Sequence, residues 1–100
     1  MKTKLKNIIL LGRVKKIEKL LNECNENSEY KFKVRRTKEK SHNQSDKGYC
    51  ITIIGVTHID FLEIAVVNAI NEFWRLNKQM GQVVVTSQHN LKLYFPNWVV

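Results

Sequence analysis

The clearest pattern in the chain is a strict alternation of apolar and polar side chains between residues 29 and 36. Tyr30, Phe32 and Val34 have one parity, and the residues between them are cations. Successive side chains of a strand point to opposite faces, so this stretch is predicted to be a half-buried strand with a cationic outer face.

A second strand is predicted over residues 49–56, where Cys50 to Val56 is almost continuously apolar and Gly55 interrupts the run. Residues 37–47 between the two strands are polar and are predicted to form a mobile loop. Two such strands joined by a polar connection are typical of a long antiparallel hairpin.

A long helix is predicted from about Ile59 to Lys78, with an N-cap at residues 57–60 and a C-terminal stop at Gly81. Its core stripe comprises Leu62, Val66, Ala69, Ile70, Phe73 and Leu76. Beside this stripe lie Ile64, Val67 and Trp74, which add more apolar surface than one core face needs. The excess indicates either a contact with a partner subunit or a helix sunk deeply into its own domain.

The rest of the second half reads as two strands, at residues 82–87 and 91–95, joined by a turn at 88–90. The final residues, 96–100, are predicted to be extended or loosely packed.

Two interpretations remain open for the N-terminal quarter. Leu10, Val14, Ile17, Leu21 and Cys24 fit the seam of a helix, which would give the order α-β-β-α-β-β. Residues 7–12, however, hold two β-branched isoleucines and a glycine where a strand could bend, which would give β-β-β-α-β-β. We favour the strand, because it agrees with the resemblance described below.

Composition limits the choice of protein class. The chain has 100 residues, 43% of them hydrophobic, which predicts one globular domain over 1–100. No apolar run reaches the length of about 18 residues that a membrane span needs, and no secretory leader is recognisable, so we expect no membrane partner and an intracellular protein. The two cysteines, Cys24 and Cys50, do not form a disulfide framework and are expected to be reduced thiols.

The positive charge is concentrated in the first half of the chain. Residues 1–48 hold 14 Lys and Arg against 6 Asp and Glu, whereas residues 49–100 hold 3 of each, so the whole net charge of +8 lies before residue 49. Charge gathered in this way attracts polyanions, although it can also serve only as a solvated basic surface.

Several spacings are similar to those of bacterial single-stranded-DNA-binding proteins and the related primosomal replication protein. Residues 7–14 resemble the family's opening apolar run followed by Gly and Arg, and residues 30–36 resemble its second strand. Residues 49–55 resemble its third strand, and residues 76–85 resemble the entry to its fourth.

The chain also departs from the family pattern. Gly48 and Ile54 stand where the family usually has ligand-facing aromatics, and Lys15 to Ser28 replace its Pro-x-Gly connection. The predicted helix is longer than the family's. The resemblance therefore implies a fold and a ligand face, but not a complete set of stacking aromatics.

The resemblance implies a small β-rich α+β fold: a five-stranded OB-fold-like barrel with one helix between strands 3 and 4. The alternative is a two-layer α-β-β-α-β-β sandwich. A barrel of this kind binds oligonucleotides. We expect a non-catalytic protein that binds single-stranded nucleic acid, DNA in the first instance, in replication or repair, and that is a homo-oligomer or has a partner protein.

The expected nucleic-acid-binding residues are the cations of the hairpin and one adjacent tyrosine: Lys31, Lys33, Arg35, Arg36, Lys38, Lys40, Lys47 and Tyr49. The expected interface residues are Ile64, Val67 and Trp74. The second hypothesis is a protein-interaction subunit of a larger replication, phage or ribosome-associated assembly, suggested by the apolar helix and the missing aromatics.

Motifs for catalysis are not found. The sequence has no glycine-rich phosphate loop, no Gly-x-Ser-x-Gly and no His-Glu-x-x-His. His42, His58 and His89 are scattered among predicted loops, a helix cap and a turn. We therefore expect no enzyme activity, no metal site and no cofactor.

Overall fold

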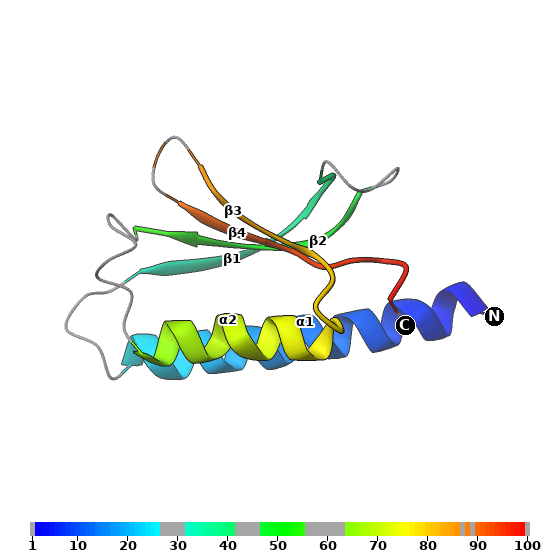
Figure 1. Cartoon of the computed structure of the whole chain (residues 1–100), viewed down its shortest axis with the longest axis horizontal. Coiled ribbons are helices and arrows are strands. Elements are labelled where there is room, and N and C mark those ends of the chain that lie inside the picture. Colours follow the sequence, from blue (N-terminus) through cyan, green and yellow to red (C-terminus); the bar gives the residue numbers. More distant parts are fainter. Residues whose placement is uncertain are drawn as a thin grey trace.

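The computed structural model describes residues 2–26, 32–41, 47–55, 64–86, 88 and 90–99. Along the chain lie helix α1 (Lys2–Glu26), strands β1 (Lys33–Glu39) and β2 (Gly48–Ile54), helix α2 (Ile64–Leu76) and strands β3 (Gln82–Val85) and β4 (Leu91–Tyr94). The two helices lie side by side against one face of the sheet, and the other face is open (Figure 1).

The predicted five-stranded barrel is wrong. The strands form a single open, four-stranded antiparallel sheet in the order β1-β2-β4-β3. The alternative α-β-β-α-β-β arrangement, in two layers, is the one that the structure adopts. The fold implied by the resemblance to single-stranded-DNA-binding proteins is therefore not the fold of this chain.

The error lies in the N-terminal quarter, where the favoured strand is the first half of a 25-residue helix. The helical seam proposed as the alternative is buried throughout: Leu10, Val14, Ile17, Leu21 and Cys24. Ile8, Ile9 and Gly12, which suggested a strand, lie on the exposed side of α1. Burial of the seam outweighs the weak preference of these three residues against helix, which amounts to about 1 kcal/mol for a glycine.

The predicted hairpin is confirmed. β1 and β2 pair antiparallel over their full length, from Lys33 opposite Ile54 to Glu39 opposite Gly48. The polar loop begins later than predicted, because the strand continues through Glu39 instead of ending at Arg36. The second pair of strands is also confirmed, and β4 is inserted between β2 and β3.

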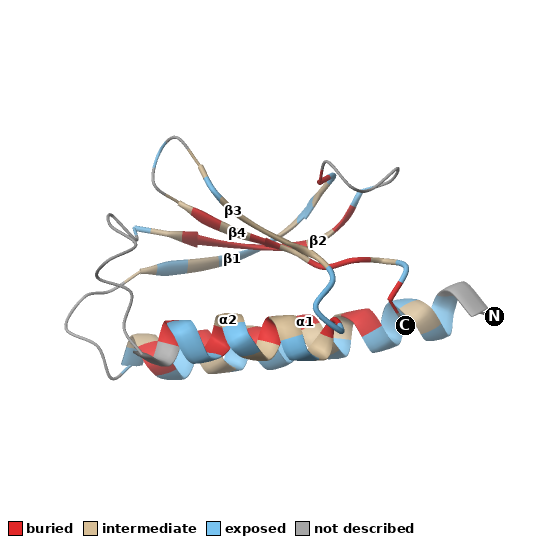
Figure 2. Ribbon diagram, in the orientation of Figure 1, coloured by how far each residue is buried: buried red, intermediate tan, exposed pale blue. Residues whose placement is uncertain are grey.

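The core lies between the sheet and the helices, as the buried residues of Figure 2 show. α1 contacts β1 and β2, and α2 packs beside α1. The buried side of α2 shares one core cluster with Leu91 and Leu93 of β4. In the predicted core stripe of α2, Val66, Ala69 and Phe73 are buried. The Phe73 ring meets that of Phe95, just after β4, edge to face at a centroid distance of 4.9 Å.

α2 ends in a pair of hydrogen bonds typical of a Schellman cap. The Gln79 amide donates to the Trp74 carbonyl at 2.7 Å, and the Lys78 amide donates to the Arg75 carbonyl at 3.2 Å. Lys78 has the positive φ of 55° that this cap requires. Gly81, predicted as the stop, instead forms the bend from α2 into β3, with φ 98°. A Cβ there would lie 2.9 Å from the Tyr94 carbonyl oxygen, so the position requires glycine.

The C-terminal residues are packed more closely than predicted. Of residues 96–99, Pro96 and Val99 are buried, and Trp98 is exposed. The Arg13 guanidinium of α1 donates hydrogen bonds to the Val99 carbonyl and, at 3.3 Å, to Asn77 Oδ1. This guanidinium therefore ties α1 to both the end of α2 and the C-terminal segment.

Some predictions fall outside the described residues: Tyr30, Lys31, the helix cap at 57–60, Leu62, and the histidines His42, His58 and His89. Ile64 begins α2, but its side chain is also outside the described part.

Candidate nucleic-acid interface

The cations of β1 divide between the two faces of the sheet. Lys33 and Arg35 have the parity of the open face and are exposed. Arg36 and Lys38 have the parity of the helix face, because they lie opposite Ile51 and Tyr49. The predicted row of cations is therefore divided between the two faces of the sheet, which meet at the β1 edge.

Arg36 is neutralised by a helix residue. Its guanidinium forms an ion pair with the Glu18 carboxylate of α1, and this hydrogen bond raises the pKa of Arg36. Lys38 remains available, although its Nζ lies 3.5 Å from the centroid of the Tyr49 ring. This cation–π contact spans a cross-strand pair.

Tyr49, the predicted stacking residue, does not lie on the open face. It packs against the core on the helix side, in line with Ile51 and Ile53 of the same strand. The aromatic residue that does have open-face parity is Tyr94 of β4, which is half-buried opposite Cys50 and Gln82. The alternation of Leu91 and Leu93 with Lys92 and Tyr94 was the signal that could have identified it.

The middle of the open face is crossed by an ion pair between β4 and β1. Lys92 Nζ pairs with Glu39 across β2, and the hydrogen bond from Lys92 is the largest cause of the lowered pKa of Glu39. Thr37 also donates to Glu39, at 2.6 Å. Cys50 lies beside this pair and is fully buried, and its burial raises the pKa of the thiol to about 11. The thiol is therefore protonated and unreactive at neutral pH.

Two polar atoms of the open face, Thr52 Oγ1 and Gln82 Oε1, are buried without a hydrogen-bond partner among the described residues. Buried polar atoms are usually paired, so these two are exceptions within the sheet, and their burial keeps them out of reach of a ligand on this face.

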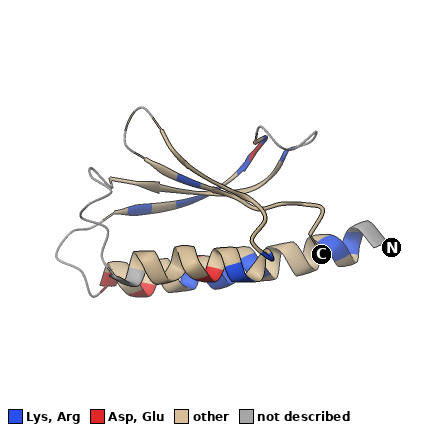
Figure 3. Ribbon diagram, viewed as in Figure 1, with Lys and Arg blue, Asp and Glu red and all other residues tan. Residues whose placement is uncertain are grey.

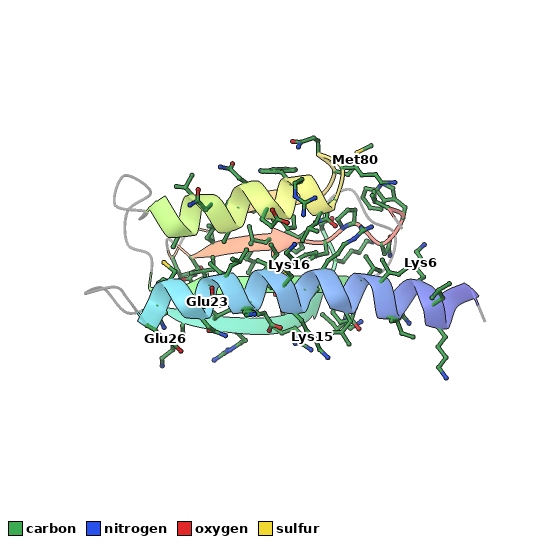
Figure 4. All side chains as sticks on the ribbon, turned by 90° about the horizontal axis from the view of Figure 1, so that it is seen from below. Lys6, Lys15, Lys16, Glu23, Glu26 and Met80 are labelled. Atoms are coloured by element: carbon green, nitrogen blue, oxygen red, sulfur yellow. The ribbon has the colours of Figure 1, made fainter. Side chains whose placement is uncertain are left out.

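α1 adds cations that the sequence analysis did not select. Glu18 faces β1. Lys15 lies three residues earlier, almost one helical turn, and points to the same side of α1 in Figure 4. Lys16 points the other way and reaches Glu72 of α2 at 3.1 Å. Lys19 follows Lys15 by four residues and is exposed. The spacing of Lys15 and Lys19 was visible in the sequence, but it has meaning only once the segment is known to be a helix.

One side of the molecule is therefore basic. It combines β1, the ends of its hairpin and the adjacent flank of α1, and Figure 3 shows Lys and Arg along these elements. We call this surface the basic side and define it by its exposed cations: Lys15, Lys19, Lys33, Arg35, Lys38, Lys40 and Lys47. None of the seven belongs to an ion pair with a described acid.

Among the described residues, no three His, Cys, Asp or Glu side chains gather in a way that could hold a metal ion. The described helices include none that is both long and apolar enough to span a bilayer.

Comparisons with known proteins gave no match to any family model, curated protein or solved structure. The function must therefore be argued from the geometry alone.

Proposed function

We propose that this chain is a non-catalytic, intracellular protein that binds single-stranded nucleic acid on the basic side. The observation that carries the proposal is the set of seven exposed cations on adjoining elements of that side, none of which pairs with an acid in the described part of the chain. Lysine and arginine on one surface neutralise phosphates and release their counterions, which drives binding that depends little on sequence.

The open sheet beside these cations favours a single-stranded ligand over a double-stranded one. An open four-stranded sheet with helices behind it is a surface on which unpaired bases can lie and stack on aromatic side chains. Lys33 and Arg35 would hold the phosphates at the edge, and Tyr94 offers an aromatic ring towards the centre.

A role in replication or repair rested on the resemblance to a barrel that the chain does not form, so it is not part of this proposal. The second candidate is a protein-interaction subunit. It is favoured by exposed apolar side chains in the first half of α1, where Leu5 is 60% and Ile8 59% exposed.

The test is a titration of a labelled oligothymidine with the protein at several salt concentrations. If about four phosphates are neutralised, log K should fall against log salt with a slope of roughly −3. Replacing both Lys33 and Arg35 by Gln should weaken binding and reduce the slope by about 1.4. Lys78→Gln is the matched control, because Lys78 is an exposed cation at the far end of α2.

The absence of binding at low salt would exclude the proposed function and leave the interaction subunit. Equal losses per charge removed in the Lys33/Arg35 variant and in Lys78→Gln would show that net charge, and not the basic side, determines binding. Tighter binding to a duplex than to the single strand would contradict the role given to the open face.

A further inference from the structure

The inference concerns the sheet edge opposite the basic side. β3 is the outer strand there, and its four residues, Gln82 to Val85, include no charge and no proline. An edge strand presents unpaired backbone N–H and C=O groups, and proteins usually protect such edges with charges, prolines or bulges. β1 has charges of this kind, with four cations in seven residues, whereas β3 is protected only by its shortness of four residues.

The flank of α2 below this edge carries two apolar side chains, Val67 and Trp74, on either side of the exposed Asn71. Glu72 reaches towards Lys16 and so marks the side of α2 that faces α1. Val67 and Trp74, at helical spacings that place them away from Glu72, therefore lie on the flank away from α1, on the side of β3. Trp74 is half-buried against the core, so only part of its ring is free on this flank. Val67 is 41% exposed, and Val85 at the end of the edge strand is 44% exposed. Backbone hydrogen-bonding groups and apolar side chains thus adjoin on one side of the molecule.

The distribution of charge indicates what this side can bind. The net charge of +8 belongs entirely to residues 1–48, and α2 and β3 come from the neutral half of the chain. Two copies that meet through this side keep their basic sides far apart, so they avoid the repulsion that any contact through α1 would cause. A polyanion, by contrast, gains nothing from a neutral surface.

A strand edge is also complementary to itself. Two antiparallel copies of β3 related by a two-fold axis satisfy each other's free backbone groups and continue an entirely antiparallel sheet. The same axis brings the apolar flanks of the two α2 helices together on one side of the joined sheet.

We propose that the chain forms a two-fold dimer in which β3 pairs with β3 of a second copy, with Val67 and Trp74 of α2 packed beneath. The dimer joins the two sheets into one and leaves a basic side at each end. This inference does not depend on nucleic-acid binding, because none of its residues belongs to the basic side.

The test is the mass of the full chain in solution, measured by sedimentation or light scattering over a range of concentrations. The wild type should approach twice its mass of 11.8 kDa as the concentration rises. Val85→Lys puts a charge into the proposed seam from each copy, like the protective charges of other edge strands, and should weaken dimerisation roughly tenfold or more. Val67→Lys tests the helix flank in the same way, and both positions are exposed, so the variants should fold.

Ile8→Lys is the matched control, because it adds the same charge at an exposed apolar position on α1. It should leave the dimer intact. A dimer lost in Ile8→Lys but kept in Val85→Lys would place the interface on α1 and overturn the proposal, as would a wild type that is monomeric at all concentrations.

Hydrogen exchange distinguishes strand pairing from helix packing alone. Backbone amides of β3 that face the free edge should exchange more slowly as the dimer forms. Unchanged exchange in β3 across the dimer transition would contradict the paired edge. Oligothymidine binding by Val85→Lys, measured where it is monomeric, tests the nucleic-acid proposal separately.

Discussion

The two edge strands of this sheet both expose backbone hydrogen-bonding groups, but their side chains differ. β1 exposes its backbone beside four cations, whereas β3 exposes its backbone beside three valines and a glutamine. Charges on β1 discourage pairing with another strand and attract polyanions at the same time. The comparison teaches that the uneven charge of the sequence is an arrangement in space, with a charged half of the chain on one side and a neutral half on the other.

The largest expected effect comes from the core beneath the neutral edge. Phe73→Ala removes a fully buried ring that packs against Phe95, and we expect a loss of about 3–5 kcal/mol in the free energy of unfolding. Urea denaturation followed by circular dichroism measures it. A loss below about 1 kcal/mol would contradict the packing of α2 beneath β4.

Alanine substitution at two glycines, one in each half of the chain, should change the free energy of unfolding in opposite directions. Gly81→Ala should cost at least about 1–2 kcal/mol, because φ is 98° and the new Cβ would meet the Tyr94 carbonyl at 2.9 Å. Gly12→Ala should stabilise the protein by about 0.5–1 kcal/mol, because Gly12 is within α1 and a Cβ there meets nothing within 4 Å. The same denaturation experiment tests both. A destabilising Gly12→Ala would contradict the exposed helix at that position.

Glu39→Gln should make the β1 half of the sheet more positive while leaving β3 neutral. It removes the acid that pairs with Lys92 and so leaves Lys92 of β4 as a free cation on the open face. We expect tighter binding to oligothymidine and a salt slope steeper by about 0.7, with stability reduced by no more than about 1 kcal/mol because the pair is partly exposed. Weaker binding with intact folding would place the nucleic acid elsewhere.

The smallest expected effect concerns the Glu72 carboxylate of α2 and its hydrogen bonds. Glu72 of α2 accepts hydrogen bonds from Arg75 and, to a lesser extent, from Lys16 of α1, and these lower its pKa to about 2 from the ordinary 4.5. A lowered carboxyl pKa gives stability that is present above pH 4.5 and is lost as the pH falls towards 2. Glu72→Gln should therefore flatten the stability profile over that window. An unchanged acid profile would show that the hydrogen bonds of Glu72, chiefly the one from Arg75, do not form in solution.

Much of the sheet could be predicted from the sequence, because alternation is a local property. Phe32, Val34 and the buried run from Cys50 to Ile53 were sufficient for the hairpin. The fold class was missed at Ile8, Ile9 and Gly12, whose local preference for a strand was weaker than the burial of Leu10, Val14 and the rest of the seam. Such a conflict between local propensity and tertiary packing is resolved only by the partner surface, which the sequence does not display.

The candidate site was predicted only in part for the same reason. The parity of Lys33 and Arg35 was correct, but the partners of Arg36 and Lys38 come from elsewhere in the chain or from the opposite strand. Lys15 and Lys19 join the basic side through the packing of α1 on β1. Which cations are neutralised depends on contacts between segments that are distant in the sequence.

The central position of β4 has a consequence for how the chain is assembled during synthesis. Ile51 of β2 acquires its neighbour Leu93 only after some forty further residues have been added. Until then α1 and the first hairpin can form local contacts, but β2 has an unprotected apolar flank and β3 has no strand beside it. A nascent chain that pauses before residue 91 would be the form most exposed to aggregation or to a chaperone.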